Sequence, residues 1–227
     1  RGAWARAVGE SATELLCASA ELRRQLLSWM PPASRARMAG HCHASAMGIE
    51  PVEELRPRRS LRKELGFDRF TLLSVGRLVP IKGLVHAIDA TAGDEGLELV
   101  IVGDGPERGA LERRAIERGA RVRFLGVRTG RDKARLLRAA DAFVCPSIRT
   151  SSGRTEGTPT AVLEAAHAGL PILASDVGGI SEVVEHERAG LLSAPGDVTS
   201  LRASIERLRE DRNLRRRLTR GARRAGS

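Results

Sequence analysis

The alternation of short apolar segments with helix-like segments over residues 70–193 constrains the fold most strongly. The apolar segments are 70–75, 97–102, 121–125, 142–145, 171–175 and 190–193. Helical sequence lies between them and continues from residue 198. Short buried strands that alternate with helices form a parallel sheet covered on both faces. We therefore predict an α/β fold with a doubly wound parallel sheet, in the common strand order 3-2-1-4-5-6.

This strand order predicts where a ligand would bind. Ligands of doubly wound sheets lie at the carboxyl ends of the strands, where the order reverses, here between strands one and four. The loop after strand one, residues 76–83, carries Arg77 and Lys82. The loop after strand four starts at residue 146 and leads to Glu156. The two loops richest in chemical groups are therefore expected to meet at one site.

The segment 146–171 contains a polar loop followed by a helix pattern. Thr158 is predicted as the N-cap and Pro159 as the first helical residue, where its missing N–H costs nothing. A helix start of this kind attracts anions, and Glu156 and Glu164 beside it could hold hydroxyl groups. An anion next to hydroxyls indicates a phosphate on a sugar. The alternative is an ordinary capped helix with two surface acids.

Arg77 and Lys82 are predicted to surround a diphosphate together with that helix start, since arginine and lysine both bind phosphate. The alternative is a pair of surface cations. No metal-ligand cluster is apparent, so these cations and the helix dipole would stabilise a departing phosphate. The loop 102–106, VGDGP, is interpreted as a tight strand-to-helix turn, because a lone near-match to a dinucleotide motif is weak. Cys145 and His167 are both expected to be packed structural side chains.

The charge of the chain is uneven. The net charge is +10, and an arginine-rich stretch begins at Arg202. Such a stretch could contact anionic lipid headgroups, although a solvated helix face is the simpler interpretation. Aromatic residues make up only 3% of the chain, which argues against binding to single-stranded nucleic acid. Three scattered cysteines, with no signal peptide and no long apolar run, favour the cytoplasm, with possible peripheral contact at the inner face of the membrane.

The first third of the chain is less regular. Residues 11–30 are predicted to form a helix or a strand–helix unit. Residues 33–66 are predicted to be irregular, a linker with one short helix before the first core strand.

Several motifs occur in order at family-like spacing. They are SVGRL…KG (74–83), VGDGP (102–106), FLG (124–126), the Glu156–Glu164 pair, GLP (169–171) and DVGGISEVV (176–184). Together they resemble the GT-B retaining glycosyltransferases of family 4, also called group 1. The polar insert before Glu156 is similar to that of the subgroup that builds exopolysaccharide or capsular polymers. The resemblance implies that the sheet is the Rossmann-like, C-terminal donor domain of a GT-B fold.

The resemblance also implies roles for individual residues. The implied catalytic residues are Arg77, Lys82 and Glu156. The implied substrate-binding residues are Gly76, Gly157, Thr158, Pro159, Thr160, Glu164, Val127 and Arg128. Glu164 would hold the ribose, and the last two residues would border the base. The donor is a nucleotide-diphosphate sugar, and the family needs neither a metal nor another cofactor.

The resemblance further implies a division of the chain. Residues 1–50 would be the end of an N-terminal acceptor domain, 51–66 an interdomain linker, and 67–227 the donor domain. The chain would then transfer sugar with retention to a glycan or lipid-linked acceptor only with the rest of that domain, and would be inactive as this segment alone. The alternatives are a non-catalytic nucleotide-sugar-binding module and a sugar-nucleotide epimerase or phosphorylase of GT-B fold. No nucleic-acid partner is expected.

Overall fold

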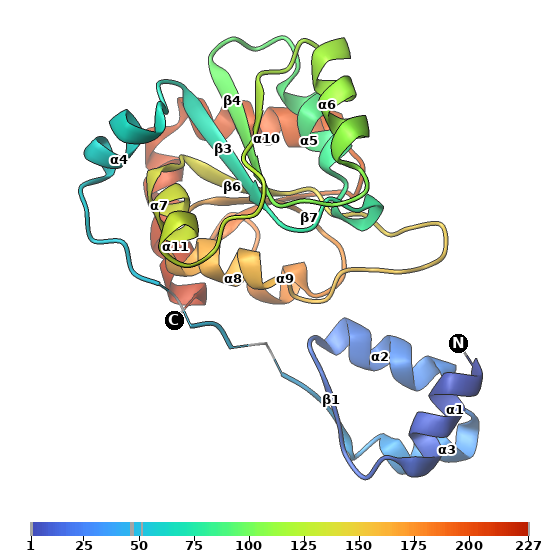
Figure 1. Ribbon diagram of the computed structural model, residues 1–227. Coiled ribbons are helices and arrows are strands. Elements are labelled where there is room, and N and C mark those ends of the chain that lie inside the picture. Colours follow the sequence, from blue (N-terminus) through green and yellow to red (C-terminus); the bar gives the residue numbers. More distant parts are fainter. Residues whose placement is uncertain (1, 46–47, 51, 227) are drawn as a thin grey trace.

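The computed structural model describes residues 2–45, 48–50 and 52–226, and its larger unit is built on a six-stranded sheet (Figure 1). The strands are β3 (Phe70–Val75), β4 (Leu97–Val102), β5 (Val122–Phe124), β6 (Ala142–Cys145), β7 (Ile172–Ser175) and β8 (Gly190–Ser193). Every neighbouring pair is parallel, and the order is β5-β4-β3-β6-β7-β8. Numbered from β3, this is 3-2-1-4-5-6. The predicted fold class and strand order are therefore confirmed.

Helices cover both faces of this sheet. They are α4 (Arg58–Leu65), the 3₁₀ turn η1 (Pro80–Lys82), α5 (Leu84–Thr91), α6 (Arg108–Glu117), α7 (Gly130–Ala139), α8 (Thr160–His167), α9 (Ile180–Val183), α10 (Val198–Glu210) and α11 (Arg212–Ala225). Residues of α4, α7 and α8 form one core with the sheet, whereas residues of α5, α6 and α10 form the other. The last helix, α11, contributes to both cores and runs along the sheet on the β8 side.

Alternation along the strands explains the two cores. Leu72 packs in one core and Leu73 in the other, and both side chains are fully buried. Successive strand residues point to opposite faces, so a strand covered on both sides must be apolar at every position. Burying a side chain of this size contributes about 1.5–3 kcal/mol relative to exposure. This is why the strands could be located from their continuous apolar runs.

A smaller unit precedes the sheet. It contains α1 (Gly2–Ser11), β1 (Leu15–Cys17), α2 (Ala20–Trp29), α3 (Pro32–Met38) and β2 (Cys42–Ala44), with β1 and β2 paired in parallel. The strand–helix alternative for residues 11–30 is thus the correct one. The prediction that 33–66 is irregular apart from one helix is wrong, because α3 and β2 also lie there. Pro32 opens α3 at a position where a missing N–H is tolerated.

The segment between the two units contains α4. This helix ends at Gly66, which has a left-handed backbone (φ +65°). Its Leu61 is fully buried in the core beneath α7. The helix is therefore anchored to the larger unit, and the chain between Ala44 and Arg58 connects the two units.

Candidate functional site

The order of the sheet reverses between β3 and β6, and the loops that follow these two strands meet there. Ile148 N donates to Ile81 O at 2.9 Å. Gly83 has φ +58°, and a Cβ on it would lie only 2.1 Å from Pro146 O. Only glycine permits both this backbone conformation and this close approach. The contact predicted between the two loops from the strand order is present.

Glu156 is fixed by groups from both loops. Lys82 Nζ lies 2.7 Å from Glu156 Oε2, and Ser147 Oγ donates to the same oxygen at 3.0 Å. The exposed fractions of the lysine and glutamate side chains are only 19% and 14%, and Ser147 is fully buried. The structure therefore brings together two of the three predicted catalytic residues. Ser147 was not predicted, since a serine in a polar loop has no distinguishing sequence pattern.

The third predicted catalytic residue, Arg77, is not part of this cluster. It is exposed, and its guanidinium makes no hydrogen bond or ion pair with any residue that the structure describes. Gly76 before it leaves room for Lys82, since a Cβ there would lie 3.3 Å from Lys82 Cε. Arg77 is thus free to turn toward an anion, whereas Lys82 must first release Glu156 or share it.

The VGDGP loop packs closely against the loop that follows β3. A Cβ on Gly103 (φ +136°) would lie 1.8 Å from Gly76 O, and one on Gly105 would lie 2.4 Å from Leu78 O. Leu78 N also donates to Asp104 O at 2.9 Å. The motif is therefore a close-packed turn between β4 and α6 that borders the site.

The start of α8 differs from the prediction. Pro159, not Thr158, occupies the N-cap position, and no side chain caps the helix. Thr158 is buried, and its hydroxyl is directed to Gly179 O (3.2 Å) and Ala18 O (3.3 Å). The loop before α9 and the small unit compete for this hydroxyl, so it is unavailable to its own helix. Gly157 is also packed, with the position of a Cβ 3.0 Å from Leu22 Cδ1.

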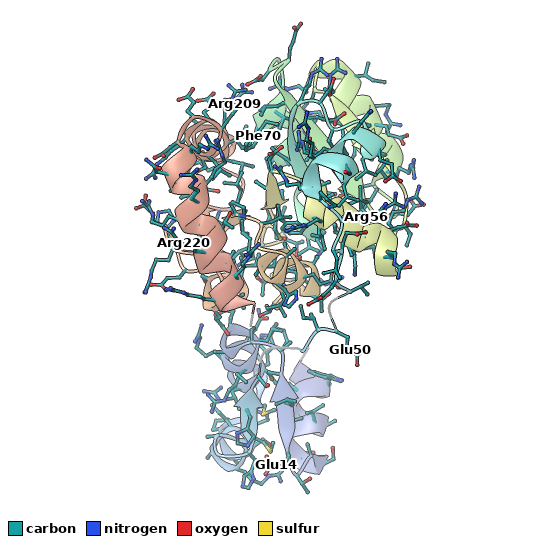
Figure 2. All side chains as sticks on the ribbon, turned by 90° about the vertical axis from the view of Figure 1, so that its left-hand side faces the viewer. Glu14, Glu50, Arg56, Phe70, Arg209 and Arg220 are labelled. Carbon is teal, nitrogen blue, oxygen red and sulfur yellow. The ribbon has the colours of Figure 1, made fainter. Side chains whose placement is uncertain are left out.

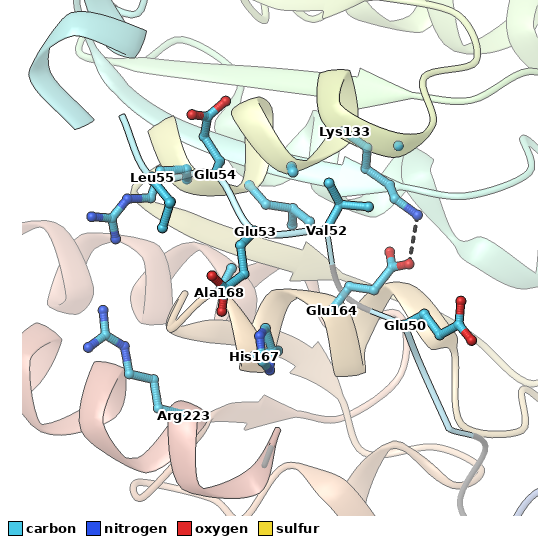
Figure 3. Close-up of a pocket in the computed structure, with 14 residues that line it drawn as sticks. Glu50, Val52, Glu53, Glu54, Leu55, Lys133, Glu164, His167, Ala168 and Arg223 are labelled. Carbon is cyan, nitrogen blue, oxygen red and sulfur yellow. Dashed lines mark hydrogen bonds and ion pairs between the residues drawn. The ribbon is translucent and has the colours of Figure 1, made fainter. Parts of the chain in front are cut away.

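Glu164 projects from α8 into a pocket of about 380 Å³ (Figure 3). Lys133 from α7 reaches its Oε1 at 2.6 Å, and residues of the connecting segment, including Glu50 and Val52, line another side of the pocket. His167 also lines it. The prediction of a packed histidine is wrong, because His167 is exposed at the last turn of α8, with Nδ1 3.3 Å from Gly226 O.

Two predicted base-bordering residues lie on the loop after β5. Val127 is 63% exposed, and the Arg128 guanidinium donates to the neighbouring Val127 O at 3.1 Å. Neither contacts Glu164 or Glu156. An exposed valine beside an exposed guanidinium offers an apolar face and a donor to a flat ring.

Cys145 ends β6 directly beneath this site. It is 6% exposed, its Sγ lies 3.5 Å from Ser147 Oγ, and burial raises the pKa of its thiol. A thiol that resists ionisation is a poor nucleophile. The prediction that Cys145 is a buried structural side chain is confirmed.

Helix α2 of the small unit contacts the loop and the helix that border the site. Both carboxylate oxygens of Glu182 accept hydrogen bonds at 2.9 Å from Ala20 N and Glu21 N, the first amides of that helix. Arg149 of the polar loop pairs with Glu21 at 3.3 Å. The polar loop before Glu156 and helix α9 therefore both contact the start of α2. No helix in the described part of the chain is long and apolar enough to cross a membrane.

Comparison with known proteins places this site in context. A family model described as Glycosyl transferases group 1 matches residues 57–225. The chain is 34% identical over 173 residues to the amylovoran biosynthesis glycosyltransferase AmsK of Erwinia amylovora, covering 73% of this chain and 41% of that protein. It is 40% identical over 156 residues to the lipopolysaccharide core biosynthesis glycosyltransferase LpsD of Rhizobium meliloti (strain 1021), covering 68% of this chain and 43% of that protein. The chain thus spans about two fifths of the length of these curated relatives.

Solved structures share the fold. Anabaena Alr3699/HepE in complex with UDP aligns with a TM-score of 0.84 at 24% identity, over 97% of this chain and 60% of that one. WaaG, a glycosyltransferase involved in lipopolysaccharide biosynthesis, aligns with a TM-score of 0.74 at 22% identity, over 94% of this chain and 58% of that chain. At this level of identity the alignments establish the common fold.

Proposed function

This chain belongs to the glycosyl transferases group 1 family, and we propose that it forms the donor-binding part of a retaining glycosyltransferase of family 4. The donor is a nucleotide-diphosphate sugar, and the acceptor is a glycan or lipid-linked glycan in polysaccharide or glycoconjugate synthesis. The observation that carries the proposal is the meeting of Lys82, Glu156 and the start of α8 at the reversal of the sheet. Relatives named for amylovoran and lipopolysaccharide synthesis support the pathway class.

The proposed roles follow from charge and position. Arg77 and Lys82 bind the diphosphate and carry the charge that grows on it as the sugar leaves, without a metal ion. Glu156 lies beside the donor sugar, and backbone N–H groups of residues 157–160 contact sugar or phosphate. Glu164 holds the ribose, while Val127 and Arg128 border the base.

The domain assignment is part of the proposal. Residues 1–50 end an acceptor domain, 51–66 link the domains, and 67–227 bind the donor. Since the chain spans about two fifths of its relatives, these residues are expected to bind the donor without transferring its sugar. The small two-stranded unit with its helices supports this, because a parallel strand pair is normally part of a larger sheet.

Thermal unfolding with a panel of nucleotides tests the proposal. UDP, GDP, ADP and their sugar conjugates are added with EDTA present. A ligand at 100 times its Kd stabilises the folded state by about 2.7 kcal/mol, which raises Tm by about 5–10 °C for a chain of this size. Glu164→Ala and Arg77→Ala should each reduce the shift. Exposed residues away from the site, Glu117→Ala and Arg113→Ala, are the matched controls.

Two outcomes contradict this assignment. Absence of any shift in the wild-type chain and in the full-length enzyme would refute nucleotide-sugar binding. An unchanged shift in both site variants would refute the placement of the site. Sugar transfer to an acceptor by the full-length enzyme, with the anomeric configuration retained, tests the reaction and excludes an epimerase.

Peripheral contact with an anionic membrane is proposed for α11. This helix carries seven arginines and no acidic residue. Its apolar side, formed by Leu214, Leu218 and Ala222, is buried against the rest of the protein. Arg212, Arg216, Arg220 and Arg224 recur every four residues, and no side-chain hydrogen bond or ion pair joins any of these four guanidinium groups to another described residue. Figure 2 shows Arg220 on the outer side of this helix. Contact would be electrostatic, since the apolar side is already buried.

Vesicle flotation tests this contact. Wild-type chain should float with vesicles that contain anionic lipid and be released by salt. The double change Arg216→Glu and Arg220→Glu should reduce flotation at least tenfold. Arg113→Glu with Arg131→Glu makes the same charge change on α6 and α7, and should have less effect. Equal effects of the two pairs, or flotation independent of lipid charge, would refute the contact.

A further inference from the structure

The partner of Glu164 has no role in the proposed function. Lys133 lies on α7, 31 residues before Glu164 on α8, and its Nζ is 2.6 Å from Glu164 Oε1. Figure 3 shows the two side chains meeting at the pocket that both of them line. Their exposed fractions are 24% and 18%. A partly buried ion pair is thus placed at the residue expected to hold ribose.

Packing of the helices does not require this pair. Leu136 and Leu137 of α7 and Val162 and Ala165 of α8 already anchor both helices in the same buried core. A partly buried ion pair adds little stability, because the cost of removing both charges from water offsets their attraction. The pair is therefore best explained by the hydrogen-bond donors and acceptors that it presents to the pocket.

The free hydrogen-bonding capacity of the pair matches a hydroxyl group. No group in the described part of the chain donates to Glu164 Oε2, so that oxygen can still accept. An ammonium group has three N–H donors, and Lys133 uses one of them on Glu164. A hydroxyl both donates and accepts, so one hydroxyl can donate to Glu164 and accept from Lys133. Two neighbouring hydroxyls would satisfy both residues.

The mixed charge of the pocket favours a neutral group over a second phosphate. Its lining includes the acids Glu50, Glu53, Glu54 and Glu164, against Lys133, Arg138 and Arg223. Four acids against three cations would not attract a phosphate. A sugar diol carries no charge, and it gains from donors and acceptors placed side by side.

We propose that Lys133 is a specificity-determining residue that recognises the ribose diol of the nucleotide jointly with Glu164. This inference rests on the proposed function and adds a second recognition group to it. Lys133 holds the carboxylate of Glu164 in one orientation and donates to a ribose hydroxyl. The pair thereby selects ribonucleotides over 2′-deoxyribonucleotides.

Titration calorimetry with matched ligands tests this role. The ligands are the nucleoside diphosphate that stabilises the wild-type chain and its 2′-deoxy counterpart, with EDTA present. Wild-type chain should bind the ribonucleotide about ten- to a hundredfold more tightly, because hydrogen bonds to charged groups are lost with the hydroxyl. Lys133→Met should weaken ribonucleotide binding, change deoxyribonucleotide binding little, and bring the ratio below about threefold.

The comparison of two ligands separates recognition from structure. A purely structural role would weaken both ligands equally and leave their ratio unchanged, which would overturn the inference while the proposed function stands. Arg135→Met is the control, since it removes a cation from the same helix that pairs with Glu64. Lys133→Gln provides a second variant if Lys133→Met does not fold. A wild-type chain that binds no nucleoside diphosphate would refute the proposed function itself, and the role of Lys133 with it.

Discussion

At the scale of single residues, Ser147 holds Glu156 together with Lys82. Its buried hydroxyl donates to Glu156 Oε2 at 3.0 Å. Ser147→Ala should lower the free energy of unfolding by about 1.5–3 kcal/mol, because a hydrogen bond to a charged group is lost in a buried place. Urea denaturation of both chains measures the difference.

The matched control for this prediction is Ser181→Ala. Ser181 is exposed and its hydroxyl makes no hydrogen bond within the described residues, so its loss should change stability by less than about 0.5 kcal/mol. Equal stability of the two variants would show that Ser147 does not hold Glu156.

Single residues also show how far the sequence could predict the site. Lys82 and Glu156 were found because the strand order places their loops together, whereas the ion pair between them was not predicted. Lys133 and Ser147 could not be found in this way. Whether a lysine on one helix reaches a glutamate on the next depends on helix rotation and spacing, which no local motif records.

At the scale of the elements, α11 depends on its cap. Asp211 accepts from Asn213 N at 2.8 Å and Leu214 N at 2.9 Å. The hydrogen bond from Leu214 N is the main reason that the pKa of the Asp211 carboxyl lies below its usual value. A lowered folded-state pKa means that the cap stabilises the protein above the unfolded-state pKa, near 4, and that this stabilisation is lost as the pH falls further.

Asp211→Ala should therefore lower Tm at pH 7, and the difference from wild type should narrow as the pH falls through about 4 to 3. Thermal unfolding at several pH values measures this. Glu210→Ala removes the same charge from an exposed neighbour that caps no helix. A difference that stays constant with pH, or that Glu210→Ala reproduces, would contradict a capping role.

The elements also explain the wrong prediction at α8. Thr158 lies just before Pro159 and a helical segment, and threonine is one of the residue types preferred at the N-cap. The structure directs its hydroxyl to Gly179 O and Ala18 O, groups 21 and 140 residues away in the chain. Capping rules describe one helix alone, whereas here a tertiary contact determines the hydrogen bond. The six strands, in contrast, were located closely, because burial on both faces leaves a local apolar signature.

At the scale of the whole molecule, the sheet was predictable and the small unit was not. Alternating strands and helices imply a doubly wound order through general rules of chain connection. In the small unit, β1 and β2 have three residues each, and its core consists of Ala5, Met30 and Met38 with partly buried neighbours. Such short, half-buried strands leave no clear periodicity.

The contact between the two units centres on Glu182, which accepts from Ala20 N and Glu21 N. Glu182→Ala leaves the first amides of α2 without these acceptors, so hydrogen exchange over residues 20–29 should quicken roughly tenfold, as expected for loss of about 1.5 kcal/mol. Exchange in β3, β4 and β6 should not change, because their hydrogen bonds lie within the sheet. Glu185→Ala is the control, since the Glu185 side chain pairs with the nearby Arg188 and, among the described residues, with no group of α2. If α2 exchanges at the wild-type rate in Glu182→Ala, Glu182 does not stabilise α2. The contacts of Thr158 and Arg149 would then hold the small unit against the larger one.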